Sequence, residues 1–140
     1  MTADNVELVR AFHLRLWGSG DRTAIDDYVH SSAVTSMTGF EGSSAEVIAE
    51  DFDRYRGAFE DIATEIVDLL GADDRVALSW RTAGTHVGPY GDIAPVATGK
   101  RITMEGVDFF RIVDAKVVEI RSFWDAAAVY RQFGLLADGL

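Results

Sequence analysis

Apolar and polar residues alternate with a period of two through most of the second half of the chain, a pattern typical of β-strands. Between residues 100 and 113 the even positions are apolar apart from one carboxylate: Ile102, Met104, Gly106, Asp108, Phe110 and Ile112. In the next segment, 116–124, the corresponding face carries Val118, Ile120, Ser122 and Trp124. Because successive side chains of a strand point to opposite faces, we expect the even face to look inward.

Further strands are predicted over 33–37, 63–72 and 75–86, and the Gly- and Pro-containing segment 87–99 is predicted to be a loop. Apolar residues three or four apart predict helices over 4–17, 21–30 and 43–59, and Asp125 and Gly134 bound a last helix. Helices followed by a run of antiparallel strands indicate an α+β fold, in which a curved antiparallel sheet wraps around the N-terminal helices. We expect one domain over residues 1–140.

The composition of the chain argues against several classes of binding partner and of functional site. The formal net charge of -10 argues against binding to nucleic acid and to anionic membrane surfaces, since both need a basic patch. The chain lacks an apolar run long enough for a signal peptide or a membrane span, so we expect a cytoplasmic protein. It also lacks cysteine, which excludes disulfides, thiol nucleophiles and thiolate metal sites.

Several local motifs carry a resemblance to a known family. They are GTHVG at residues 84–88, EGVDFFRIVDAK at 105–116, Trp124-Asp125, and YRQFG at 130–134. With the order of elements, they resemble the SnoaL-like polyketide cyclases of the nuclear transport factor 2-like superfamily. The resemblance implies a cone-shaped α+β domain with a deep pocket. Its members include aldol-type cyclases, epoxide hydrolases, ketosteroid isomerases, cofactor-independent hydroxylases and non-catalytic binding proteins, so the reaction stays open.

Three departures from the family patterns narrow the reaction. The acid/base aspartate of the aldol cyclases is expected three residues before Asp125, where this chain has Ser122. The epoxide hydrolase pattern needs an aspartate at the same place. The base of the ketosteroid isomerases is expected just after the first short strand, where this chain has Met37 and Thr38.

Asp108 is the first candidate for chemistry. A carboxylate on an apolar inward face should be desolvated and have a raised pKa, as a general acid/base requires. Alternatively, Asp108 is a structural residue whose carboxylate is satisfied by a tyrosine, by His86 or by backbone amides. His86 shares its strand face with Trp80 and Thr82, so it is a candidate partner or proton shuttle for Asp108, or else an ordinary histidine at a strand end.

The remaining candidates would form an aromatic, adaptable wall for a flat lipophilic ligand. These substrate-binding candidates are Trp80, Met104, Phe110, Ser122, Trp124, Met37, Phe40 and His13. The alternative interpretation is that they are core residues. The histidines lack metal-site spacing and the glycines lack a phosphate-binding pattern, so we predict no metal and no cofactor.

The sequence therefore predicts a cofactor-free enzyme of the SnoaL-like type, in which Asp108 performs acid/base chemistry and His86 assists. Its substrate would be a small lipophilic, polyketide-like or carbonyl-bearing compound, and its reaction of the cyclase, isomerase or hydroxylase type. The alternative is a non-catalytic protein that binds a hydrophobic small molecule. The odd face mixes Val107, Phe109, Val113, Val117 and Phe123 with charged residues, which predicts a homodimer.

Overall fold

The computed structural model describes residues 2–37 and 40–136, without the side chains of residues 37 and 40–44. Its helices are α1 (Thr2–His13), α2 (Ala24–Tyr28), α3 (Ser44–Ala58) and α4 (Ala126–Gln132), and a π-helical turn η1 (Leu14–Gly18) extends α1. Its strands are β1 (Val29–Met37), β2 (Phe40–Ser43), β3 (Phe59–Ala72), β4 (Arg75–His86), β5 (Arg101–Val113) and β6 (Lys116–Trp124). The predicted helices and strands are thus present, with shifted ends.

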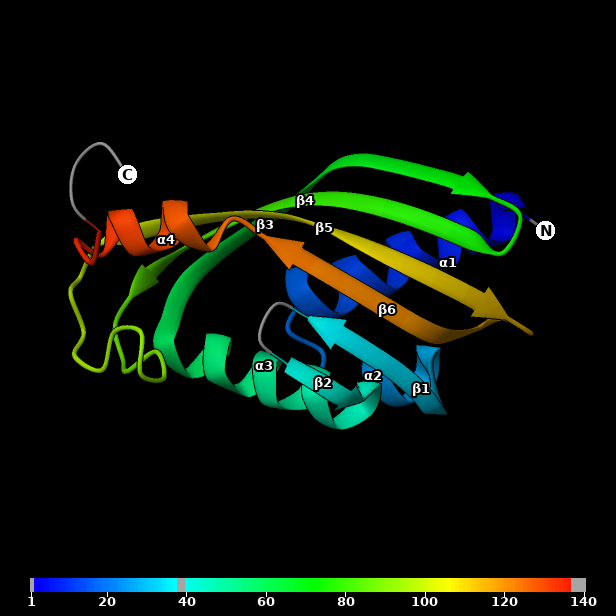
Figure 1. Ribbon diagram of the computed structural model, residues 1–140, viewed down its shortest axis with the longest axis horizontal. Coiled ribbons are helices and arrows are strands. Elements are labelled where there is room, and N and C mark those ends of the chain that lie inside the picture. The colour runs from blue at the N-terminus through cyan, green and yellow to red at the C-terminus, as the bar shows by residue number, and fades with distance from the viewer. Residues whose placement is uncertain (1, 38–39, 137–140) are drawn as a thin grey trace.

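The strands form a single sheet in the order β2-β1-β6-β5-β4-β3. Figure 1 shows this sheet curving over the N-terminal helices, with α4 at the end of the molecule away from the N-terminus. Helix α1 packs on β3 and β4, and α3 packs on β1 and β2. The predicted α+β architecture, with a curved sheet around N-terminal helices, is confirmed. Among the described residues, no helix combines the length and hydropathy that crossing a membrane requires.

One strand pair runs in a direction that the alternation pattern did not indicate. Strand β1 pairs with β6 in parallel, with Val34 opposite Glu119 and Thr35 opposite Ile120. The other pairs along the described sheet are antiparallel, as expected. A parallel pair needs a long connection, and here α3 and four strands lie between β1 and β6 in the chain. Hydrophobic alternation marks the faces of a strand but carries no information on its direction.

At the start of β6, a β-bulge changes which side chains point inward, so the predicted inward face is wrong there. Arg111 lies opposite Glu119, but the next residue, Ile112, lies opposite Val117, so the bulge shifts the alternation by one residue. As a result Val117 is fully buried, whereas Val118 was predicted to point inward. Beyond the bulge, Ile120 is buried as expected.

Two apolar clusters make up the core. One joins α1 and α2 to the middle of the sheet through Phe12, Leu78 and Phe110. The other lies toward α4 and joins α3 to β5. Trp17 and Trp80 are partly buried and pack against both clusters. They also line a cavity, which therefore lies where the two clusters meet.

Candidate functional site

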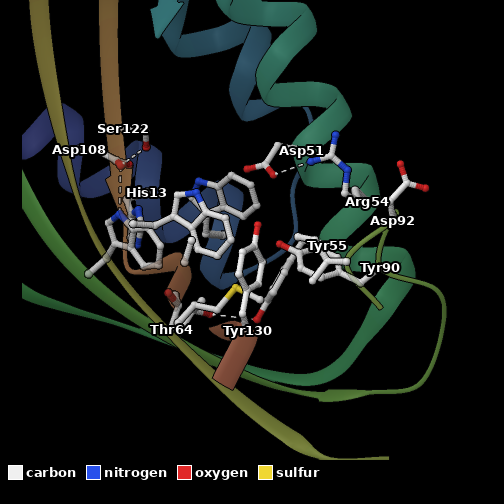
Figure 2. A pocket seen from close by; sticks show the side chains of 18 residues that line it. His13, Asp51, Arg54, Tyr55, Thr64, Tyr90, Asp92, Asp108, Ser122 and Tyr130 are labelled. Atoms are coloured by element: carbon white, nitrogen blue, oxygen red, sulfur yellow. Dashed lines mark hydrogen bonds and ion pairs between the residues drawn. The ribbon is translucent and has the colours of Figure 1, made fainter. Parts of the chain in front are cut away.

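The cavity has a volume of about 570 Å³ and receives side chains from α1, η1, α3, α4, the loop 87–99 and strands β3 to β6. That volume is in the range of sites for small organic molecules. Figure 2 shows two separate groups, one with Asp108, Ser122 and His13 and the other with Asp51, Arg54 and Asp92. The rest of the lining is largely apolar and aromatic and includes Trp17, Met104 and Trp124.

Asp108 on β5 is the buried carboxylate of the first group. The indole nitrogen Nε1 of Trp80 donates a hydrogen bond of 3.1 Å to its Oδ1, and the Ser122 hydroxyl donates to the same oxygen. Burial raises the pKa of Asp108 to about 6, although the hydrogen bonds from Ser122 and Trp80 oppose this shift. The carboxyl group is thus largely ionised at neutral pH but remains close to its titration point, as acid/base chemistry requires.

The register of strands β4, β5 and β6, together with Gly106, determines where Asp108, Trp80 and Ser122 lie. Asp108 lies opposite Ser122 on β6, and Gly106 lies opposite Trp80 on β4. A Cβ atom on Gly106 would overlap the ring atom Cζ2 of Trp80. Because residue 106 is glycine, the indole can approach the β5 backbone closely and reach the carboxylate two residues further on.

His13, at the end of α1, lines the same cavity and is 3% exposed. The rings of Phe12 and Phe110 meet edge to face at 6.2 Å, which holds this end of α1 against β5. Burial lowers the pKa of His13 to about 4, so its imidazole is neutral at pH 7. Its Nε2 atom is buried without a hydrogen-bond partner in the described part of the chain.

The second group combines α3 residues with side chains from the loop 87–99 and α4. Its charged members are Asp51, Arg54 and Asp92, and its hydroxyls come from Tyr55, Tyr90 and Tyr130. Arg54 Nη1 lies 3.5 Å from Asp51 Oδ1. Burial nevertheless raises the pKa of Asp51 to about 6, against the effect of Arg54. The pKa of Tyr90 is raised by burial first and then by the charge of Asp51.

The residues of this second group are not among those that the sequence pattern predicted for the site. The signal was present for Asp51, which follows Ile48 by three residues and precedes Tyr55 by four, and so belongs to the apolar stripe of the predicted helix. Tyr90 and Asp92 lie in an irregular loop, where no periodicity indicates which side chains turn inward.

The structure brings six predicted residues together at the cavity: Asp108, Trp80, Met104, Ser122, Trp124 and His13. It does not bring Phe110 there, because that ring is buried in the core against Phe12. The side chains of Met37 and Phe40 lie outside the described residues.

His86 also lies away from the cavity lining. It is fully buried, with its ring between Phe59 and Phe133 at 5.4 and 5.0 Å, and its Nδ1 accepts a hydrogen bond of 3.0 Å from the Thr98 amide. The strand residue opposite Asp108 is Leu78, and eight residues of β4 separate it from His86. Eight residues of strand span about 25 Å, so His86 is too distant to assist Asp108 directly. In the structure it fixes the end of the loop 87–99.

Among the described residues, no three His, Cys, Asp or Glu side chains gather closely enough to hold a metal ion.

Several solved structures are similar to this chain. Crystal structures similar over most of both chains include AclR, a candidate hydroxylase from Streptomyces galilaeus (27% identity, TM-score 0.86, 99% of this chain and 89% of AclR). A candidate SnoaL-like polyketide cyclase from Jannaschia sp. CCS1 is 22% identical (TM-score 0.83, 98% and 96% covered). An NTF2-like protein from Burkholderia thailandensis E264 is 21% identical (TM-score 0.74, 95% and 98% covered).

No curated protein matches the sequence. The sequence model of the SnoaL-like polyketide cyclases, however, matches residues 7–133. This match covers most of the chain, including the second half of α1, the whole sheet and the cavity residues that these elements carry. The chain therefore belongs to the SnoaL-like polyketide cyclase family.

Proposed function

We propose that this protein is a cofactor-free enzyme that moves a proton on a small lipophilic, carbonyl-bearing compound, with Asp108 as general acid/base. The observation that carries the proposal is a buried carboxylate with a pKa near 6 at the wall of a largely apolar cavity. Isolated buried carboxylates are costly, and strongly raised pKa values gather at functional sites.

In the proposed step, ionised Asp108 takes a proton from the carbon next to the substrate carbonyl. The C–H electron pair moves into the enolate, and the protonated carboxyl group then returns the proton to carbon or oxygen. Trp80 and Ser122 hold Oδ1, so Oδ2 is assigned to the proton. Proton abstraction beside a carbonyl is a first step shared by cyclisation and isomerisation, so the proposal does not depend on which of them follows.

The similarity to AclR favours a hydroxylase as the later reaction, whereas the family favours a cyclase. Both can follow the proposed first step, which creates an electron-rich carbon; hydroxylation would in addition consume dioxygen as the oxidant. The position of Ser122 argues against the aldol cyclase mechanism with its usual carboxylate. The carboxylate of this site stands instead on the neighbouring strand, at Asp108.

A second candidate is a binding protein without turnover, in which Asp108 only anchors a ligand. The two hydrogen bonds to Oδ1 favour it, because they already satisfy part of the carboxylate.

An exchange experiment separates the two candidates without knowledge of the natural substrate. The flat ketone 1-tetralone, in deuterated buffer at pH 7.5, should exchange its α-protons faster with the protein than without it, as followed by NMR. Asp108→Asn keeps the shape of the side chain but removes the base, so exchange should fall by about a hundredfold or more. Unfolding temperature and tetralone affinity, measured on the same variant, serve as controls. Tetralone that binds but exchanges no faster than in buffer would leave the binding protein as the function.

A further inference from the structure

The proposed proton transfer uses one charged side chain of the cavity wall, Asp108, and leaves the others without a role. Among the described residues, three carboxylates line the cavity, Asp51, Asp92 and Asp108, against the single guanidinium of Arg54. His13 is neutral at pH 7 and does not alter this balance. The wall is therefore net negative, and the formal charge of the whole chain, -10, has the same sign. A cavity of one sign concentrates ligands of the opposite sign.

The α3 end of the cavity carries the carboxylates Asp51 and Asp92 and the guanidinium of Arg54, whose Nη1 lies 3.5 Å from Asp51 Oδ1. Burial raises the pKa of Asp51, and the charge of Arg54 opposes this shift. Asp51 also acts across the cavity, because its charge contributes to the raised pKa of Asp108. The Asp51 carboxylate would therefore gain from a second positive charge.

Aromatic rings line the same cavity as this carboxylate. Tyr55 stands edge to face with Tyr90 at 6.5 Å and with Trp17 at 6.4 Å, and all three rings line the cavity. Figure 2 shows Tyr55 and Tyr90 beside the Asp51–Arg54 pair and apart from Asp108. Ring faces attract cations, and a carboxylate among such rings is the chemistry of sites that bind protonated amines.

We propose that the natural ligand is an apolar compound carrying a protonated amine, which the α3 end binds through Asp51, Tyr55 and Tyr90. The apolar middle of the cavity holds the carbon skeleton, and the oxygen-bearing end lies at Asp108. This inference rests on the proposed function for the Asp108 end and adds the class of substrate.

Three probes of matched shape test the charge preference: 2-naphthylmethylamine, 2-naphthylmethanol and 2-naphthoate. Calorimetry at pH 7.5 should show the amine binding at least fivefold more tightly than the alcohol, with the carboxylate weakest. Asp51→Asn should abolish the advantage of the amine while leaving alcohol affinity nearly unchanged. Glu50→Gln is the matched control, since it removes the same charge from an exposed neighbour on α3; it should keep the preference.

Equal affinity for amine and alcohol, or a preference for naphthoate, would overturn the inference and show that Arg54 dominates this end. Equal loss of the amine preference in Glu50→Gln and Asp51→Asn would also overturn it, since the effect would then come from the overall charge. These outcomes are independent of the tetralone exchange. A failed amine preference with intact exchange refutes the substrate class alone, and the reverse result refutes the enzyme alone.

Discussion

At the scale of single residues, burial shifts the pKa values of two cavity side chains, Asp108 and His13, in opposite directions. Asp108 binds its proton more tightly in the folded protein than in the unfolded chain, because its pKa rises from 3.8 to about 6. Its contribution therefore makes the protein more stable as the pH falls from about 6 to 4. His13 resists protonation when folded, with a pKa lowered from 6.5 to about 4, so its contribution makes the protein less stable over a similar range.

Two substitutions should separate these effects. The stability of Asp108→Asn relative to the wild type should fall as the pH is lowered from 7 to 4. The stability of His13→Gln relative to the wild type should rise over the same interval. Asp51, whose pKa is also raised, is present in all three proteins and largely cancels in the comparison. Urea unfolding at a series of pH values measures both differences, and a pH-independent difference for Asp108→Asn would show that Asp108 is not desolvated.

The alternation of residues predicted the inward face of β4, β5 and the part of β6 beyond its bulge, and Asp108, Trp80, Met104 and Trp124, all on that face, line the cavity. It could not indicate how far along a strand each residue lies from the others. His86 and Phe110 were assigned to the cavity for that reason. Position along the strand depends on register, which is fixed by pairings that a single sequence does not reveal.

At the scale of elements, the contact between β4 and β5 depends on Gly106. Gly106→Ala should displace the Trp80 ring and weaken its hydrogen bond to Asp108, because the added methyl group overlaps that ring and approaches the Phe123 carbonyl oxygen. Overpacking of this kind costs about 1–3 kcal/mol of unfolding free energy. Tetralone exchange should fall as well.

Gly57, near the end of α3, offers a matched control. A Cβ atom there would meet nothing within 4 Å, and the residue is exposed. Gly57→Ala should therefore stabilise the protein by about 0.5–1 kcal/mol, because alanine loses less conformational freedom in a helix. Urea titrations of both variants give the comparison. If Gly106→Ala were as stable as the wild type, Trp80 would not be held over β5 as described.

The helices and the strands other than β2 were predicted with their order and approximate ends, because amphipathic periodicity is strong in α3 and in the long strands. The short strand β2, the π-helical turn after α1, the bulge near the start of β6 and the parallel pairing of β1 were not predicted. Each arises from tertiary contacts: the bulge lets Val117 enter the core, and the parallel pair is set by the path of the chain around α3.

At the scale of the whole molecule, the outer face of the sheet combines exposed aromatic rings with paired charges. Phe109 and Phe123 are 39% and 51% exposed and meet edge to face at 6.1 Å. Nearby, Arg81 bridges Glu65 and Glu105 at 2.5 and 2.7 Å. We propose that this face pairs with a second copy of itself, because an apolar patch among satisfied charges is suited to a self-complementary interface.

Light scattering should then report a dimer at micromolar concentration. Phe123→Lys should give a monomer that keeps its fold, since the residue is half exposed, as circular dichroism would verify. Val96→Lys is the control, because Val96 is 75% exposed in the loop 87–99. A wild-type monomer, or a dimer unaffected by Phe123→Lys, would contradict the proposed interface.

The parallel pairing of β1 with β6 has a consequence for the time at which the cavity forms. During synthesis β1 leaves the ribosome long before β6. Its parallel pairing with β6 can therefore form only after most of the chain has been made. Contacts between such distant segments close slowly. Ser122 and Trp124 arrive on that same late strand. The ligand site is therefore completed only after synthesis of β6, and a nascent chain arrested before this point has β1 without its β6 partner.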